Sequence, residues 1–93
     1  MKYKIKQTTK FKKDFKRVIK RGADPNEFEK ILMILASGET IPEKYRDHPL
    51  FNTAEYQDCR ELHICPDWLL VYKYYSDTVI LLLIRTGSHS DLF

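Results

Sequence analysis

The chain contains few of the residues that mark a disulfide scaffold, a membrane protein or a low-complexity segment. It has two cysteines, three glycines and four prolines among 93 residues. The C-x₅-C spacing of Cys59 and Cys65 fits neither a zinc nor a redox motif, so we expect two packing residues rather than a disulfide. No apolar run approaches the roughly 20 residues that span a bilayer. The basic N-terminus lacks the apolar segment of a signal peptide, and we expect one cytoplasmic domain over residues 1–93.

Acidic residues are almost absent from the first part of the chain. Residues 1–21 contain ten Lys or Arg and one acid, Asp14, which gives this segment a charge of +9. Residues 22–93 contain six Lys or Arg and twelve acids, a charge of −6. A concentrated basic block favours a polyanionic partner such as nucleic acid, although a solvated helix face has the same composition.

Hydrophobic periodicity predicts two helices after an N-terminal strand. Residues 2–7 alternate as in a half-buried strand with a basic outer face. A helix with one apolar stripe should begin after Thr8 or Thr9 and stop at Gly22. A second helix should run between Asp24 and Gly38, since Pro at the first helical position and Glu at the third complete its N-terminal signals.

Three strands are expected in the second half of the chain, after an irregular segment over residues 39–55. They fall at residues 56–64, 68–75 and 78–85, separated by tight turns, and Thr86-Gly87-Ser88 should break the last strand. The resulting order is β-α-α-β-β-β. The sequence therefore predicts an α+β domain in which a helical hairpin packs on a mostly antiparallel sheet.

All three histidines lie in three short segments beside Pro, Gly or Asp. These segments are Asp47-His48-Pro49-Leu50, His63-Ile64-Cys65-Pro66-Asp67-Trp68 and Arg85-Thr86-Gly87-Ser88-His89-Ser90-Asp91-Leu92-Phe93. If the last two strands pair antiparallel, the exit of the last strand lies beside the start of its neighbour. His89 would then lie near the turn that carries His63 and Asp67, whereas nothing in the sequence fixes the segment with His48.

Two kinds of chemistry fit such a cluster. Three imidazoles and a carboxylate could ligate zinc, but no two histidines are closely spaced. Alternatively, two histidines in opposite protonation states could cleave RNA through its 2′-hydroxyl, one as base and one as acid. Arg85 or a helix lysine could then supply positive charge at the phosphate. Trp68 and Phe93 could stack on bases, although a core role for Trp68 and a hydrophobic latch for Phe93 are the simpler alternatives.

With these motifs assembled, the chain resembles the YafQ branch of the RelE/ParE toxins of bacterial type II toxin–antitoxin systems. The resemblance covers essentially the whole chain and is carried by three motifs in order, namely Asp47 to Leu50, Arg60 to Tyr72 and Arg85 to Phe93. Cys65 is a departure, because related toxins often have a charged residue there.

This resemblance implies a RelE/ParE-like fold and a ribosome-dependent endoribonuclease that cuts mRNA in the A site without a cofactor or metal. It implies proton and phosphate chemistry by His48, His63, Asp67 and His89, and nucleotide binding by Trp68 and Phe93, with Arg85 expected at the phosphate. Ribosomal RNA would be contacted from the first helix by Lys10, Lys12, Lys13, Lys16, Arg17 and Lys20. It also implies a cognate antitoxin, through which the complex would bind operator DNA.

Two other functions are compatible with the same fold. A ParE-like gyrase inhibitor would act by binding alone and would need no histidine cluster. A non-toxic RNA- or protein-binding module would leave growth unaffected when expressed. The three histidines favour the nuclease, and the sequence leaves open which of them is base and which is acid.

Overall fold

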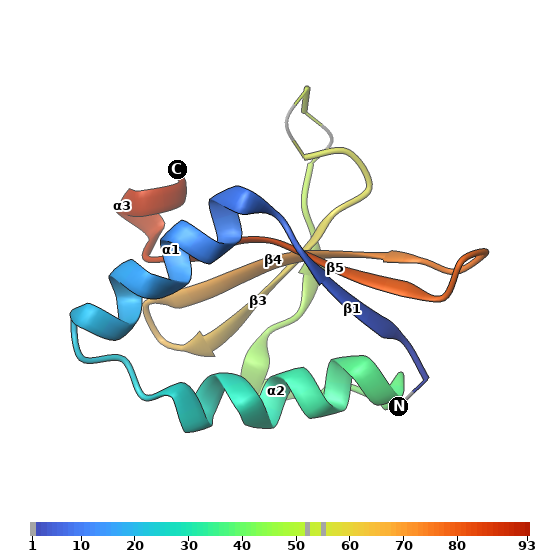
Figure 1. Ribbon diagram of the computed structural model, residues 1–93, viewed down its shortest axis with the longest axis horizontal. Coiled ribbons are helices and arrows are strands. Elements are labelled where there is room, and N and C mark those ends of the chain that lie inside the picture. The colour runs from blue at the N-terminus through green and yellow to red at the C-terminus, as the bar shows by residue number, and fades with distance from the viewer. Residues whose placement is uncertain (1, 52, 55) are drawn as a thin grey trace.

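A computed structural model describes residues 2–51, 53–54 and 56–93 of the chain (Figure 1). Its elements are β1 (Lys4–Gln7), α1 (Thr9–Lys20), α2 (Pro25–Ser37), the short 3-10 helix η1 (Glu43–Tyr45), β2 (His48–Pro49), β3 (Arg60–Cys65), β4 (Trp68–Tyr75), β5 (Ile80–Gly87) and α3 (His89–Leu92).

The strands form one five-stranded sheet in the order β1-β5-β4-β3-β2. β1 pairs with β5 in parallel, and the other three pairings are antiparallel. This confirms the predicted α+β class and the mostly antiparallel sheet. The antiparallel β4–β5 pairing aligns Leu69 with Gly87, which brings the end of β5 to the start of β4 as expected.

The two long helices begin and end at the residues that the sequence marks. The Thr8 hydroxyl accepts a hydrogen bond from the Phe11 amide, and the Asp24 carboxylate accepts one from the Asn26 amide. Gly38 ends α2 with φ of +71°, a conformation that costs glycine little. The two helices diverge in a V from the short link that joins them (Figure 1). They contact each other through Phe15 and Phe28, whose ring centroids lie 4.9 Å apart.

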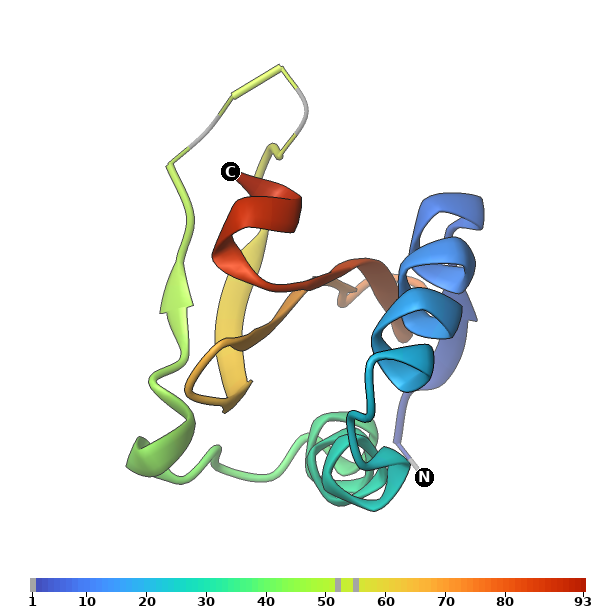
Figure 2. The ribbon, with the colours of Figure 1, turned by 90° about the vertical axis from the view of Figure 1, so that its left-hand side faces the viewer.

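Each face of the sheet carries its own apolar cluster. Leu62, Leu70 and Leu83 face α1 and α2 and belong to the larger cluster. Leu69 and Val71 face the other way, toward α3 and the segment before β3. Figure 2 shows α3 on the side of the sheet away from α2, beside the loop that precedes β3. The end of β3, the start of β4 and the end of β5 therefore meet at one end of the sheet, close to the residues that carry His63 and His89.

Several expected boundaries are wrong. The strand expected from residue 56 begins at Arg60, and the one expected from residue 78 begins at Ile80, because residues 76–79 form a turn in which Val79 adopts φ of +55°. Thr86 and Gly87 continue β5 instead of breaking it. The segment expected to be irregular contains η1 and β2. Met1, Asn52 and Glu55 lie outside the described residues.

The last turn of the chain forms a helix that the periodicity did not indicate. In α3 the Ser88 hydroxyl accepts from the Asp91 amide, and the Asp91 carboxylate accepts from the Ser88 amide, which makes a reciprocal capping box. A Cβ at Gly87 would lie 2.8–2.9 Å from Asp91 atoms, so this turn requires glycine. Both cysteines are free, as expected. None of the helices in the described part of the chain is long and apolar enough to cross a membrane.

Candidate active site

The three histidines converge beside β2 and β3, at the β2 side of the sheet. β2 pairs His48 with Glu61 of β3, and His63 follows two residues later on the same face of that strand. α3 then brings His89 over the same face. The ring centroids of His48 and His63 are 6.4 Å apart, and those of His63 and His89 are 5.8 Å apart. The structure therefore joins His48 to the predicted pair, through a strand that the sequence did not reveal.

Asp47 explains why the His48 segment is fixed at this position. Its Oδ2 accepts hydrogen bonds from Arg60 Nε at 3.0 Å and Nη2 at 2.6 Å, and its Oδ1 accepts one from the Tyr72 hydroxyl. Burial and this carboxylate both raise the pKa of Tyr72, so the phenol remains a donor. The Asp47 side chain thus ties the segment before β2 to β3 and β4.

His48 is held between a carbonyl and a buried carboxylate. Its Nδ1 lies 2.8 Å from the Arg46 carbonyl oxygen, so Nδ1 carries a proton. Its Nε2 lies 3.4 Å from Glu61 Oε1. Glu61 is only 4% exposed, and its Oε2 has no hydrogen-bond partner within the described ranges. The contact places a buried carboxylate against Nε2, so the His48 ring is oriented from both of its nitrogens.

His89 is oriented by Asp67. The Asp67 Oδ1 lies 3.3 Å from His89 Nδ1 and accepts the His89 backbone N–H at 3.2 Å. A proton on Nδ1 satisfies this contact and leaves Nε2 as the unprotonated nitrogen of the neutral ring. Both side chains are exposed at the surface. The arrangement suits proton transfer at Nε2 by a histidine whose tautomer is fixed.

A cleft of about 620 Å³ runs along His63 and His89. Lys44 and Arg46 of the η1 segment also line it, as does Glu27 of α2. Arg46 is a left-handed residue with φ of +51°, which turns the chain between η1 and β2. Lys44, Arg46 and Glu61 were not identified from the sequence, since their approach depends on the course of residues 39–55. The cleft combines proton-transfer groups with cations suited to a phosphate.

The residues expected to bind substrate have different surroundings. Arg85 Nε and Nη2 donate to the Asp14 carboxylate at 2.6 and 3.1 Å, and this bond raises the pKa of Arg85. Trp68 is 6% exposed, stacks near Phe28 in the core and donates its indole N–H to Thr86 at 2.8 Å. This burial favours the core role that the sequence left open for Trp68, in which its ring holds β4 against the helices.

Phe93 is 61% exposed at the end of α3, and its ring makes an edge contact with the Tyr56 ring at 6.1 Å. Of the two aromatic residues expected to stack on bases, Phe93 alone presents a ring to solvent. Its position follows from the capping box that forms α3.

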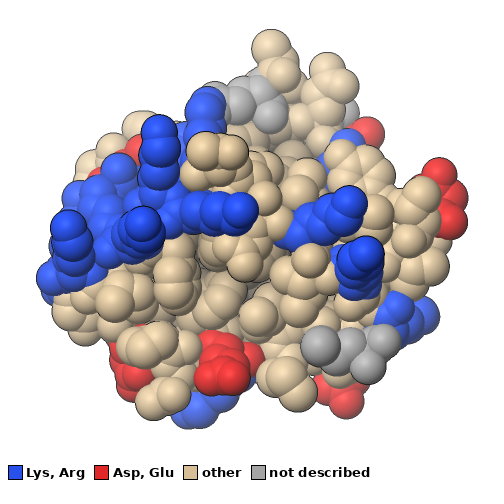
Figure 3. Space-filling view, in the orientation of Figure 1, with Lys and Arg blue, Asp and Glu red and all other residues tan. Residues whose placement is uncertain are grey.

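The basic residues of α1 form a continuous surface. Figure 3 shows Lys and Arg side chains gathered over this helix. The residues expected to contact RNA are all exposed, and they are Lys10, Lys12, Lys13, Lys16, Arg17 and Lys20. Arg17 also donates to Asp14 at 2.9 Å, so its charge is partly engaged within the helix.

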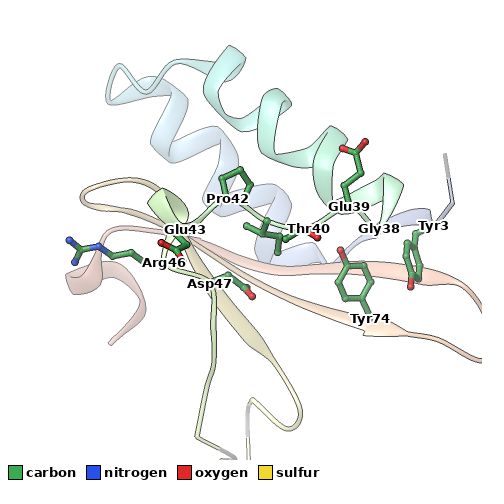
Figure 4. A pocket seen from close by; sticks show the side chains of 10 residues that line it. Tyr3, Gly38, Glu39, Thr40, Pro42, Glu43, Arg46, Asp47 and Tyr74 are labelled. Carbon is green, nitrogen blue, oxygen red and sulfur yellow. The ribbon is translucent and has the colours of Figure 1, made fainter.

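A separate, tyrosine-lined hollow of about 450 Å³ lies behind the segment that carries His48 (Figure 4). Tyr3, Tyr74 and Asp47 line it, and Arg46 points away from it. The Tyr74 hydroxyl donates to the Leu35 carbonyl oxygen at 2.7 Å, and burial raises the pKa of Tyr74 to about 12. Tyr74 therefore joins the sheet to α2, and none of the three histidines lines this hollow.

Metal ligation was the weaker of the two interpretations of the histidines. No group of three or more His, Cys, Asp or Glu side chains within residues 2–51, 53–54 and 56–93 is arranged to hold a metal ion. Both ring nitrogens of His48 lie against protein oxygens, of Arg46 and Glu61, and Nδ1 of His89 lies against Asp67.

Known proteins share both the sequence and the fold. Residues 3–93 match the family model described as the YafQ bacterial toxin of type II toxin–antitoxin systems. The mRNA interferase toxin YafQ of Escherichia coli strain B is 34% identical over 90 residues, which cover 96% of this chain and 94% of that protein. A metal-bound toxin from Helicobacter pylori superposes with a TM-score of 0.88 at 41% identity, covering 98% and 99% of the two chains. The Escherichia coli DinJ–YafQ complex gives 0.86 at 34% identity, covering 98% of each chain. This chain therefore belongs to the YafQ family of bacterial toxins of type II toxin–antitoxin systems.

Proposed function

We propose that this toxin is a ribosome-dependent mRNA endoribonuclease that cleaves by attack of the 2′-hydroxyl on the adjacent phosphate. The observation that carries the proposal is the row of His48, His63 and His89, with carboxylates at both ends and a cleft beside it. The curated relative that covers 96% of this chain is named an mRNA interferase. A gyrase inhibitor that acts by binding alone would need none of these proton-transfer groups.

The proton transfers are assigned to the histidines that line the cleft. His63 and His89 form the acid–base pair, since both border the space that a phosphate would occupy. Asp67 fixes the tautomer of His89, so Nε2 exchanges the proton. His48, held in place by Glu61, assists beside them as a further acid–base or phosphate contact. Each such transfer is worth about 10²–10⁴ in rate.

The charge at the phosphate comes from the η1 segment. Lys44 and Arg46 line the cleft, whereas Arg85 is bound to Asp14. Phe93 holds a nucleobase by stacking, a contact worth roughly 1–3 kcal/mol. Trp68 acts indirectly by fixing the turn that carries Asp67. Reduced cleavage by Lys44→Gln and Arg46→Gln, with unchanged cleavage by Lys73→Gln on β4, would support this assignment.

The basic surface of α1 contacts ribosomal RNA during cleavage. In the absence of a target it is covered by an acidic segment of a cognate antitoxin, and the complex binds operator DNA through that antitoxin. The structural relatives include a toxin in complex with DinJ. The phosphate contacts predict a steep fall of ribosome affinity with salt, and each neutralised lysine should reduce that slope by somewhat less than one.

Primer extension on a translated message tests the whole proposal. Expression of the parent should arrest growth and produce cuts inside codons, and purified toxin should cut the message only when ribosomes are present. His63→Ala and His89→Ala should abolish cleavage, while Lys30→Gln on the outer face of α2 should not. Intact mRNA together with DNA damage would indicate a gyrase inhibitor rather than a nuclease. Unaffected growth would favour a non-toxic module.

A further inference from the structure

The Asp67–His89 contact separates two hollows. On one side lies the histidine-lined cleft described above. On the other side lies a second hollow of about 320 Å³, between the end of α1 and the start of β4. Asp67 and Ser88 border this second hollow, whereas His89 borders the first. The pair of side chains that handles the proton is therefore a wall with space on both sides.

This pair of side chains is accessible at the surface. The side chains of Asp67 and His89 are 72% and 58% exposed. Their contact is made through Asp67 Oδ1, which also accepts the His89 backbone N–H. An RNA strand that crosses this exposed pair would therefore meet the His89 ring, with one nucleotide on either side.

The second hollow offers the chemistry of a nucleoside site. Half-buried Ala23 borders it together with the small exposed parts of Val18 and Trp68, which are 5% and 6% exposed, and Arg21 and Ser88 supply polar groups. The Arg21 guanidinium is held in place, because Nη1 and Nη2 donate to Asp91 at 2.6 and 3.2 Å. This bond raises the pKa of Arg21 and leaves the exposed guanidinium with donors to spare. A small apolar surface beside a planar cation suits a base and its ribose.

We propose that this second hollow binds the nucleotide on one side of the scissile phosphate, while the nucleotide on the other side lies in the histidine-lined cleft. The inference rests on the proposed function, because the wall is reactive only if Asp67 and His89 act on a phosphodiester. An RNA strand whose scissile phosphate is at the wall must continue past it. The hollow bordered by Arg21 and Ala23 is the space that it enters, and it discriminates nucleotides by size.

Filling the hollow tests the proposal without touching the proton-transfer groups. Ala23 is the residue to change, since Ala23→Leu adds volume inside the hollow. Asn26→Leu, on the exposed side of α2, is the matched control. Single-turnover cleavage is measured with purified toxin on ribosomes programmed with messages that differ only at the A-site codon.

Ala23→Leu should slow cleavage about 10- to 100-fold, because displacing a neighbouring nucleotide misplaces the reacting phosphate. The loss should be larger where a purine rather than a pyrimidine enters the hollow, while Asn26→Leu should cleave like the parent. Cleavage by Ala23→Leu at the parent rate, with the parent codon profile, would overturn the inference. So would unchanged cleavage combined with lost antitoxin binding, which would assign the hollow to the antitoxin.

Two controls keep the outcomes separable. If Ala23→Leu unfolds, as judged by circular dichroism, Ala23→Gly tests the same hollow by enlarging it, and the purine-to-pyrimidine preference should then shift toward purines. An unshifted preference in that variant counts against the inference. If the parent itself leaves ribosome-bound mRNA uncut, the proposed function fails, and that result is distinct from an insensitive Ala23 variant.

Discussion

Asp14 offers the sharpest test of how the basic helix is joined to the sheet. It is the single acid of the first 21 residues and is only 3% exposed. Its carboxylate accepts from Arg85 Nε at 2.6 Å, Arg85 Nη2 at 3.1 Å, Arg17 Nη2 at 2.9 Å and the Thr86 amide at 3.3 Å. One carboxylate thus accepts hydrogen bonds from α1 itself and from the C-terminal part of β5. Asp14→Ala removes the acceptor for all four.

The expected loss in the free energy of unfolding follows from the Arg85 charge, which Asp14→Ala deprives of its carboxylate. The Arg85 side chain is 17% exposed and would keep its charge without its carboxylate. Removing one partner of such a buried pair costs about 3–5 kcal/mol. A domain of this size has a free energy of unfolding of about 5–15 kcal/mol. We therefore expect Asp14→Ala to lose a large part of the stability while Asp14 itself touches no predicted catalytic residue.

Urea unfolding followed by circular dichroism measures this loss. With a slope of about 1–3 kcal/mol/M, the midpoint should fall by about 2 M. Lys13→Ala, on the exposed face of the same helix, should change the free energy of unfolding by less than about 0.5 kcal/mol. A loss below about 1 kcal/mol for Asp14→Ala would refute the reasoning, because the ion pair would then be no more than a surface contact.

A double replacement separates stability from substrate binding. Asp14→Leu combined with Arg85→Met replaces the buried ion pair by apolar side chains, a change that is often neutral. If Arg85 only anchors Asp14, the double variant should fold and cleave mRNA normally. If Arg85 also contacts the phosphate, as the sequence predicts, the folded double variant should cleave more slowly.

Three further predictions concern titration and reactivity. Hydrogen bonds from Arg21 and Ser88 hold the pKa of Asp91 well below its ordinary 3.8, so its stabilisation is present above that pH and lost as the pH falls below it; Asp91→Asn should flatten acid unfolding in that range. Burial raises the pKa of Tyr74 to about 12, so an ultraviolet titration of the parent should show a late phenol that Tyr74→Phe lacks. Burial raises the pKa of both thiols, and buried Cys59 should alkylate more slowly than half-buried Cys65 in the folded toxin because the reagent reaches it less.

Local patterns were sufficient for most of the fold. The helix signals at Thr8, Asp24 and Gly38 act within a few residues of the chain, so they mark the same ends in sequence and structure. The strand-forming composition of residues 68–75 predicted β4 at its observed bounds. Such signals are strong because each depends on hydrogen bonds or burial that the segment makes with its nearest neighbours.

The site could be predicted only where strand pairing is implied by chain order. Hairpin geometry was enough to bring His89 to Asp67, since a tight turn leaves two strands little choice of partner. His48 depended on a two-residue strand whose pairing with Glu61 has no periodicity to reveal it. α3 was missed because four residues are too few for a repeating apolar stripe.

By itself, the sequence determined the class of fold, the basic helix and the residue types of the site, because these follow from composition, spacing and local capping. Only the tertiary structure decided what each residue does there. It placed Trp68 in the core and Arg85 on Asp14, and brought Glu61 against His48. These outcomes depend on contacts between segments far apart in the chain, whose free energies are fixed by packing and burial that no short stretch of sequence contains.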